Sequence, residues 1–242
     1  MIKFENTEVV GWEHAIRGMR NPLNSWEKSD SWFLDNQDGL HNIIGDLNDS
    51  VPDHIEDAYI GPNDLSLMKQ LRNAGTDHRK FMRMIVVYVD ITAPLYWWKE
   101  FDTYKVGTVA NSCSTMHKIA AKEFTLEDFS HEHLCDDELE VLKIVIERLN
   151  DNREHYNRKQ HRKDYWWQMI QLLPSSYNQK RTVMLNYEVL ANIYKSRLNH
   201  KLDEWRELCA WIETLSYAEL VTGPDLSRTP ICDEIMEEAK EI

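Results

Sequence analysis

The segment NYEVLANIYKSRLNHKLDE, residues 186–204, says more about this chain than any other stretch of it. Its pattern predicts helix, and on a helix its polar and apolar residues share one stripe, because they are spaced by multiples of three or four. Polar groups on a partly apolar face need partners. Two interpretations stay open: internal ion pairs such as Arg197 with Glu204, or contact with a polar ligand. The stripe comprises Asn186, Leu190, Ile193, Arg197, His200 and Glu204.

Outward from this segment, the chain alternates long helical patterns with a few separated strand patterns, which predicts the α+β class. We expect one domain over residues 1–242, with surface insertions at 36–63 and 118–136. Strands are predicted at Met82–Ile91 and Arg181–Asn186, and a short strand or helix around Val9–Met19. Helices are predicted at Leu65–Asn73, Leu95–Asp102, Asp137–Asn157, Asp164–Leu172, Tyr187–Leu198 and Lys201–Leu220.

The composition of the chain limits the kinds of binding partner and the cellular location that we expect. The net charge is −13 over 242 residues, which argues against a nucleic-acid polymer, whereas a few local cations still suit a small anion. Apolar runs such as Ile85–Val89 are too short to span a membrane, and the residues after Met1 show no secretory signal. The four cysteines lack paired spacing. We therefore expect a cytoplasmic protein with reduced thiols.

Other side chains allow both bland and specific interpretations. The nine tryptophans fit core and subunit packing, or stacking on a planar ligand. Neighbouring His131 and His133, with Cys135, form a cluster that we expect to be solvated, so no metal site is predicted. The basic segment 158–163 is typical of a solvated helix end, with a phosphate or subunit contact as the alternative. No phosphate-binding glycine loop is present.

A family resemblance enters at this point. The order and spacing of Leu173-Pro174, Asn186, Asn192, Arg197, His200 and Glu204 resemble the C-terminal half of the flavin-dependent thymidylate synthases. Upstream, His78 and the run from Ala93 to Phe101 resemble that family's strand and following helix. The similarity covers roughly residues 64–117 and 165–221. It implies a mixed fold in which long helices flank a central antiparallel sheet.

The loop from Thr103 to Met116 is compared with the family signature Arg-His-Arg-x-x-Ser-x-Asn-x-x-Ser-x-Arg. With one inserted residue, Asn111 and Ser114 match its Asn-x-x-Ser core. Without that insertion, Lys105 takes the place of the second arginine and Cys113 that of the second serine. The sequence leaves open whether Ser114 or Cys113 faces the pocket.

Three cations of the family are missing here. Thr103 replaces the first arginine of the signature, Thr115 or Met116 the last, and Ile170 an arginine for the substrate phosphate. Each lost guanidinium removes a charge-assisted contact of roughly 1.5–3 kcal/mol. Substitutes would have to come from other cations, for which the candidates are Lys99, Lys105, Arg79 and Arg83. Glu100 stands where the family has glutamine, which changes the polarity beside the base.

The resemblance implies a homotetrameric flavoenzyme with FAD between its subunits. FAD would accept a one-carbon unit from methylenetetrahydrofolate and deliver it to C5 of a pyrimidine deoxynucleoside monophosphate, with NADPH as reductant. Catalysis is assigned to Ser114 and Arg197, and substrate binding to Lys99, Glu100, Asn111, Ser114 and Arg197. The flavin is assigned to His78, Tyr104, Lys105, Asn111, Asn186, Asn192 and His200.

Alternatives remain at several of these positions. His78 also fits a capping or surface histidine, and Asn186 fits a helix N-cap, a role compatible with flavin contact. For the whole chain, the alternative is a non-catalytic nucleotide- or flavin-binding protein that keeps the fold and has lost the chemistry.

Overall fold

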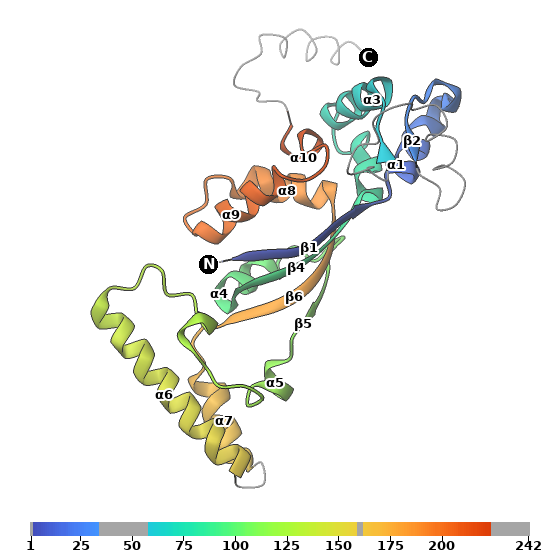
Figure 1. Ribbon diagram of the computed structural model, residues 1–242. Coiled ribbons are helices and arrows are strands. Elements are labelled where there is room, and N and C mark those ends of the chain that lie inside the picture. The colour runs from blue at the N-terminus through green and yellow to red at the C-terminus, as the bar shows by residue number, and fades with distance from the viewer. Residues whose placement is uncertain (1, 34–57, 159–161, 224–242) are drawn as a thin grey trace, which may run out of the picture. The chain divides into compact units, whose positions relative to one another are not determined.

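The computed structural model describes residues 2–33, 58–158 and 162–223 (Figure 1). Its contacts group the chain into two compact units, and the one-domain interpretation stays a prediction. We call them the sheet unit, formed by Met1–Glu8, Val87–Leu185 and Ser196–Trp211, and the helical unit, formed by Val9–Val86, Asn186–Lys195 and Ile212–Ile242. No helix among the described residues has the length and apolar character needed to cross a membrane.

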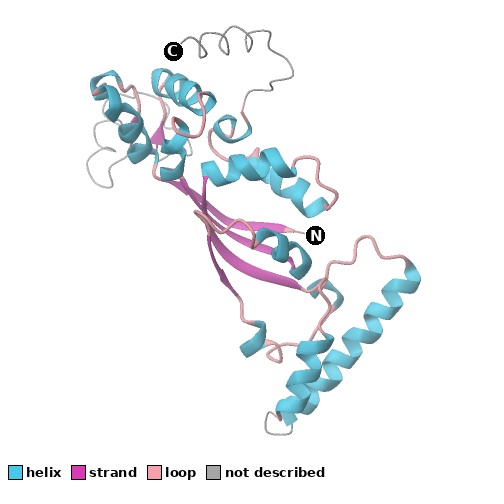
Figure 2. Cartoon of the chain, turned by 180° about the vertical axis from the view of Figure 1, so that it is seen from behind, coloured by secondary structure: helices cyan, strands magenta, loops and turns pink. Residues whose placement is uncertain are grey.

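A four-stranded antiparallel sheet contains β1 (Lys3–Val10), β4 (Val86–Pro94), β6 (Asn178–Asn186) and β5 (Val109–Ser112), in that spatial order (Figure 1), and Figure 2 shows the same sheet from behind. In β4 the buried Val87, Val89 and Ile91 alternate with the exposed Tyr88, as the period of a strand requires. The strand begins four residues later than predicted, and Arg79–Met84 form the 3₁₀ helix η3 instead. That segment lacks the β-branched residues that favour strands.

Helix α4 (Leu95–Phe101) follows β4 directly and supplies most of an aromatic core. Trp97, Trp98 and Phe101 are buried, and Trp205 from α9 (Asp203–Ile212) packs against Trp97 with ring centroids 4.9 Å apart. The indole of Trp98 donates a 2.8 Å hydrogen bond to the carbonyl of Gln179 in β6. These tryptophans confirm the packing interpretation for part of the set, whereas Trp26, Trp32 and Trp167 are exposed.

A second core lies in the helical hairpin of α6 (Asp136–Arg158) and α7 (Lys163–Leu172), which run side by side in Figure 1. The segment 118–136 begins at the last residue of α5 (Thr115–Lys118) and contains η4 (Leu126–Asp128). It contributes buried side chains to this core. The segment, which was predicted to be a surface insertion, therefore also packs against the hairpin. The core comprises Ile119, Ala120, Phe124, Phe129, Leu142, Ile146, Leu149 and Met169.

The helical unit is fastened by a buried ion pair. Arg20, at the end of α1 (Trp12–Arg20), donates from Nε to Asp64 of α3 (Pro62–Asn73) over 2.6 Å. Asp64 also accepts from the hydroxyls of Ser29 and Ser31. Burial raises the pKa of Asp64, but these hydrogen bonds and Arg20 outweigh it, so the pKa lies below its usual value.

The remaining elements of the helical unit are short. Strands β2 (Trp32–Phe33) and β3 (Ala58–Tyr59) pair antiparallel, and most of the predicted insertion 36–63 lies outside the described residues. The 3₁₀ helices η1 (Asn21–Leu23) and η2 (Trp26–Lys28) follow α1. Helix α10 (Glu219–Thr222) ends at Gly223.

The stripe from Asn186 to Glu204 is divided between two helices, in keeping with the separate helices predicted at Tyr187–Leu198 and Lys201–Leu220. Helix α8 (Tyr187–Arg197) ends at Arg197, and α9 begins only at Asp203. In the intervening turn the amide of Leu202 donates to Nδ1 of His200, a local side-chain bond of the kind that competes with helix. The predicted helix Lys201–Leu220 is also divided: α9 ends at Ile212, and Tyr217, with a φ of 52°, lies before α10.

Candidate functional site

Arg197 is held in one orientation by three partners in the sheet unit. Its Nε donates to the hydroxyl of Tyr104 over 3.0 Å and its Nη1 to Oε2 of Glu100 over 3.0 Å. The guanidinium also lies 4.4 Å from the centre of the Trp205 ring, a distance typical of a cation–π contact. Because each contact fixes a different direction, the plane of the guanidinium is set before any ligand arrives.

Glu100 is fixed at one oxygen. Its Oε2 accepts from Trp205 Nε1 over 3.0 Å as well as from Arg197, and His200 Nε2 lies 3.7 Å away. Within the described residues, Oε1 of Glu100 and Nη2 of Arg197 have no hydrogen-bond partner. The Glu100 side chain is 38% exposed and that of Arg197 19%. A carboxylate acceptor and a guanidinium donor thus stand open next to each other; we call this pair the Glu100–Arg197 edge.

The expected pairing of Arg197 with Glu204 is wrong. Glu204 is buried and accepts from the hydroxyl of Tyr96. Burial, followed by the Glu204 carboxylate, raises the pKa of Tyr96 above its usual value. An internal ion pair does exist, as one interpretation of the stripe required, but its carboxylate is Glu100 from α4.

A small cavity of about 370 Å³ is lined by Tyr104, the residue that accepts from Arg197. Lys105 and Arg181 line it too, and Arg181 is occupied by Asp102 at 2.7 Å and by the face of Trp98. Of the other residues predicted nearby, Lys99 and Asn111 are exposed. Asn111 lies in β5, opposite Thr182 of β6, where the sequence predicted only a loop.

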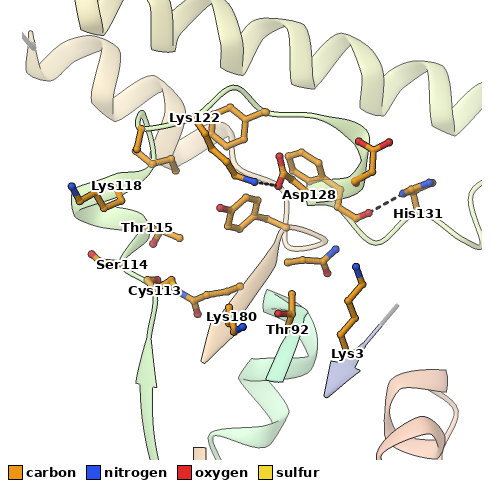
Figure 3. A pocket seen from close by; sticks show the side chains of 18 of the residues that line it. Lys3, Thr92, Cys113, Ser114, Thr115, Lys118, Lys122, Asp128, His131 and Lys180 are labelled. Carbon is orange, nitrogen blue, oxygen red and sulfur yellow. Dashed lines mark hydrogen bonds and ion pairs between the residues drawn. The ribbon is translucent and has the colours of Figure 1, made fainter. Parts of the chain in front are cut away.

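Ser114 and Cys113 line a different and larger cavity, of about 780 Å³ (Figure 3). Both residues line this cavity, so the question of whether Ser114 or Cys113 faces the pocket stays open. The Ser114 hydroxyl accepts from the amide of His117 over 3.1 Å and caps α5. No residue of the Glu100–Arg197 edge lines this cavity. The two residues assigned to catalysis, Ser114 and Arg197, therefore lie at separate places in the sheet unit.

The helical unit holds the remaining predicted residues. Asn186 Oδ1 accepts from the amide of Val189 over 3.1 Å, which confirms its capping role for α8. Asn192 Oδ1 accepts from Arg79 over 3.1 Å, and His78 is exposed before η3. Both Arg79 and Arg83, considered as replacement cations, hydrogen-bond to the buried Glu188.

Positions of the missing family arginines carry no cation. Thr103 donates its hydroxyl to the carbonyl of Glu100 over 2.7 Å, Met116 is exposed, and Ile170 packs against the hairpin core. The histidines of the 131–135 segment have separate partners: His131 contacts the Phe129 carbonyl, and His133 contacts Asp203. In the part of the chain that the structure describes, no group of three potential ligands could hold a metal ion.

Sequence reasoning missed Trp205, whose indole and ring face fix both members of the Glu100–Arg197 edge. Nothing local in the sequence shows that Trp205 reaches α4, because the contact joins residues 105 positions apart.

The sequence matches no family model and no curated protein. Similar structures do exist. Flavin-dependent thymidylate synthase from Helicobacter pylori, complexed with FAD and dUMP, gives a TM-score of 0.61 at 16% identity over 91% of this chain and 98% of that one. A second structure of that enzyme with FAD and dUMP gives 0.62 at 15% identity, over 95% and 100%. A UMP/dUMP methylase from Streptomyces cacaoi bound with 5-Br dUMP gives 0.52 at 12% identity, over 88% and 89%.

The chain therefore has an α+β fold shared with nucleotide-methylating proteins. More closely, it has a fold like that of the flavin-dependent thymidylate synthases. This confirms the expected fold class. At such low identity the likeness concerns the fold alone, and activity has to be argued from the residues of this chain.

Proposed function

We propose that this protein transfers a one-carbon unit to C5 of a pyrimidine deoxynucleotide in a flavin-dependent reaction. The observation that carries the proposal is the Glu100–Arg197 edge. The pyrimidine ring of uracil or cytosine presents hydrogen-bond donors and acceptors side by side, so it requires an acceptor and a donor in the same plane. Glu100 Oε1 and Arg197 Nη2 supply that pair.

Recognition by this edge would be selective because both groups are already ordered. Binding then costs little side-chain entropy. Trp205 and Tyr104 hold the guanidinium, so a bound base would meet it without rearrangement. We assign substrate contacts to Lys99, Glu100, Asn111, Ser114 and Arg197, as the resemblance implies.

The residues assigned to the flavin fit a polar cofactor within each unit. In the sheet unit Lys105 and Asn111 are exposed, and His200 is half-buried beside Glu100. In the helical unit His78 is exposed, and the amide nitrogen of Asn186 has no hydrogen-bond partner among the described residues. These donors suit the carbonyl and phosphate oxygens of FAD, and Tyr104 and Asn192 complete the proposed set.

Bound FAD would supply the redox chemistry, with NADPH as reductant and methylenetetrahydrofolate as the one-carbon source. The chain's own part is to bind the nucleotide, orient the base and exclude water. Arg197 would hold the base through Nη2. Ser114, in the loop after β5, would contact the nucleotide as the second proposed catalytic residue. A homotetramer, as the resemblance implies, would allow Ser114 and Arg197 of different subunits to serve one site.

A thermal-shift panel with dUMP, dCMP and dTMP tests this assignment. A nucleotide present at 100 times its dissociation constant should stabilise the protein by about 2.7 kcal/mol. The Arg197→Ala variant should lose that stabilisation, and Arg148→Ala, which removes an exposed arginine of α6, should keep it. An unchanged shift in Arg197→Ala would remove Arg197 from the nucleotide site.

A second candidate function is supported by the missing cations at Thr103, Met116 and Ile170: a nucleotide- or flavin-binding protein without catalysis. FAD titration combined with the same panel separates the two. Binding of both ligands without transfer of a methyl group would favour the binding protein. A protein that takes up neither ligand would contradict both candidates.

A further inference from the structure

The Glu100–Arg197 edge presents its two open atoms in a fixed order. Trp205 Nε1 and Arg197 Nη1 each donate over 3.0 Å to Oε2 of Glu100, which leaves Oε1 as the open acceptor. On the guanidinium, Nε donates to Tyr104 and Nη1 to Glu100, so Nη2 has no hydrogen-bond partner among the described residues. A ligand that meets this edge therefore needs a donor opposite Glu100 and an acceptor opposite Arg197.

Neither side chain can exchange its role. An ionised carboxylate only accepts hydrogen bonds, and a guanidinium only donates them. An amide at position 100 could turn either its oxygen or its NH₂ group toward a ligand, whereas both oxygens of Glu100 are acceptors. The edge consequently reads as acceptor and then donor, whichever oxygen of Glu100 faces the ligand.

Uracil and cytosine both offer a donor beside an acceptor, and they differ in the third group of the same ring edge. Cytosine carries the amino group N4, then the acceptor N3, then the carbonyl O2. When N4 donates to Oε1 of Glu100 and N3 accepts from Nη2 of Arg197, O2 lies beyond the guanidinium. A carbonyl oxygen beside a cation is attracted to it.

Uracil places its third group on the opposite side. Its ring edge carries a carbonyl on each side of the donor N3–H. When N3–H donates to Glu100 and one carbonyl accepts from Arg197, the other carbonyl lies beside the Glu100 carboxylate. Two oxygens with negative charge then face each other without a proton between them, and this repulsion weakens the binding of uracil.

The surroundings of the edge preserve this difference. The Arg197 side chain is only 19% exposed and lies on the ring of the fully buried Trp205. Glu100 cannot turn its carboxylate away from a uracil carbonyl without losing its hydrogen bonds to Arg197 and Trp205. A misplaced carbonyl is therefore neither well screened nor relieved by a simple rotation.

We infer that Glu100 selects cytosine over uracil, so that dCMP is the nucleotide this edge takes. The inference rests on the proposed function for the position of the base at the edge, and it adds the identity of the base. Glu100 receives the amino group and Arg197 donates to N3. A pair of side-chain contacts to one base discriminates strongly enough for a preference of about tenfold in dissociation constant.

Isothermal titration calorimetry of the full chain with FAD present tests the inference. The ligands are dCMP, dUMP and the analogue of dCMP whose amino group is replaced by hydrogen. The dissociation constant of dCMP should be about tenfold lower than that of dUMP. The analogue should also bind about tenfold more weakly than dCMP, because it leaves Oε1 of Glu100 without a donor.

The Glu100→Gln variant should remove the preference. Arg197 and Trp205 both donate to the position of Oε2, so the amide oxygen takes that place and the NH₂ group takes the open one. This group repels the cytosine amino group and donates to the uracil carbonyl that the carboxylate repels. In this variant dUMP should bind at least as tightly as dCMP.

Glu207→Gln is the matched control, because Glu207 is an exposed residue of α9 with no hydrogen bond or ion pair among the described residues. It should keep the preference for dCMP. Three results would overturn the inference and leave the proposed function standing: dUMP bound as tightly as dCMP by the unsubstituted protein, the analogue bound as tightly as dCMP, or a preference for dCMP that survives Glu100→Gln. A chain that binds none of the three nucleotides would contradict the proposed function and this inference with it.

Discussion

The Glu100–Arg197 edge and the cavity of about 780 Å³, whose lining includes Lys3 and Lys118, both lie in the sheet unit and use charge in opposite ways. At the edge, each charged group is already engaged by hydrogen bonds that leave one atom open. In the cavity, Lys3 and Lys118 are engaged by nothing among the described residues. The edge therefore has a fixed geometry, and the cavity has charge without a fixed geometry.

This difference predicts different kinds of recognition. A preorganised donor and acceptor discriminate between ligands by hydrogen-bond pattern. Mobile ammonium groups attract anions of many shapes, with an attraction that salt screens. Substitutions at the edge should consequently change the stability of the fold, and substitutions of the cavity lysines should change only binding.

The largest effect is expected at Trp205, which contacts both members of the Glu100–Arg197 edge. Trp205→Ala should lower the free energy of unfolding by about 3–5 kcal/mol, because it empties a fully buried site and removes the partners of Trp97 and Arg197. Denaturant unfolding measures the change. Trp26→Ala, at an exposed tryptophan, should cost little, and an equal loss in both variants would contradict the preorganised edge.

A smaller effect is expected at Tyr96, whose hydroxyl donates to Glu204, the residue before Trp205. Tyr96→Phe removes the hydrogen bond to the buried Glu204 and should cost about 1–3 kcal/mol. Because the folded state raises the pKa of Tyr96, its contribution is complete below the ordinary tyrosine pKa of about 10 and is lost as pH rises beyond it.

Thermal unfolding followed between about pH 9 and about pH 11, roughly one unit below and above that ordinary value, checks the sign. Stability of the unsubstituted protein should fall more steeply above pH ~10 than that of Tyr96→Phe. A steeper fall in the variant would show that the hydrogen bond to Glu204 does not keep the Tyr96 hydroxyl protonated in the folded state.

A double-mutant cycle compares paired charges directly. Glu100→Ala and Arg197→Ala should show a coupling energy of about 1 kcal/mol, since the pair is partly buried and fixed by Trp205. The cycle for Glu5 and Lys180, a more exposed pair, should give less than about 0.5 kcal/mol. A larger coupling energy for Glu5 and Lys180 than for Glu100 and Arg197 would mean that the edge is no more ordered than an exposed ion pair.

The smallest effect is expected at the cavity lysines. Lys3→Gln and Lys118→Gln should change the free energy of unfolding by no more than about 0.5 kcal/mol, because neither lysine has an ion pair to lose among the described residues. Chemical denaturation measures this. A loss above about 1 kcal/mol, twice the range of ordinary surface substitutions, would show that these lysines support the fold.

Much of the fold followed from local patterns. The alternation from Val86 to Ile91 and the turn-former before α3 predicted elements that the structure contains, with boundaries shifted by a few residues. Strand β5 was missed, and β1 was anticipated only at its end by the strand or helix predicted around Val9–Met19, because every residue of β5 and most residues of β1 are exposed. Such strands owe their conformation to hydrogen bonds with neighbours that are distant in sequence.

The site was predicted less completely. Arg197 and Glu100 were named, but their pairing was not, since the helical stripe suggested Glu204 as the partner. The break after Arg197, where the turn holds a hydrogen bond from the amide of Leu202 to His200, was implied by the helix predicted to end at Leu198, but it was not used to separate Glu204 from Arg197. The cavity lysines were not singled out either, because Lys3, Lys118 and Lys180 come together only through the order of the strands.

A direct assay of C5 methylation tests the central claim, that this chain is a flavin-dependent nucleotide methylase. The purified protein is incubated with FAD, NADPH and methylenetetrahydrofolate, and dUMP or dCMP is analysed by mass spectrometry. The account predicts a nucleotide that gains one methyl group at C5 only when FAD is present, and no product with Arg197→Ala. Nucleotide that binds but stays unmethylated under all these conditions would contradict it.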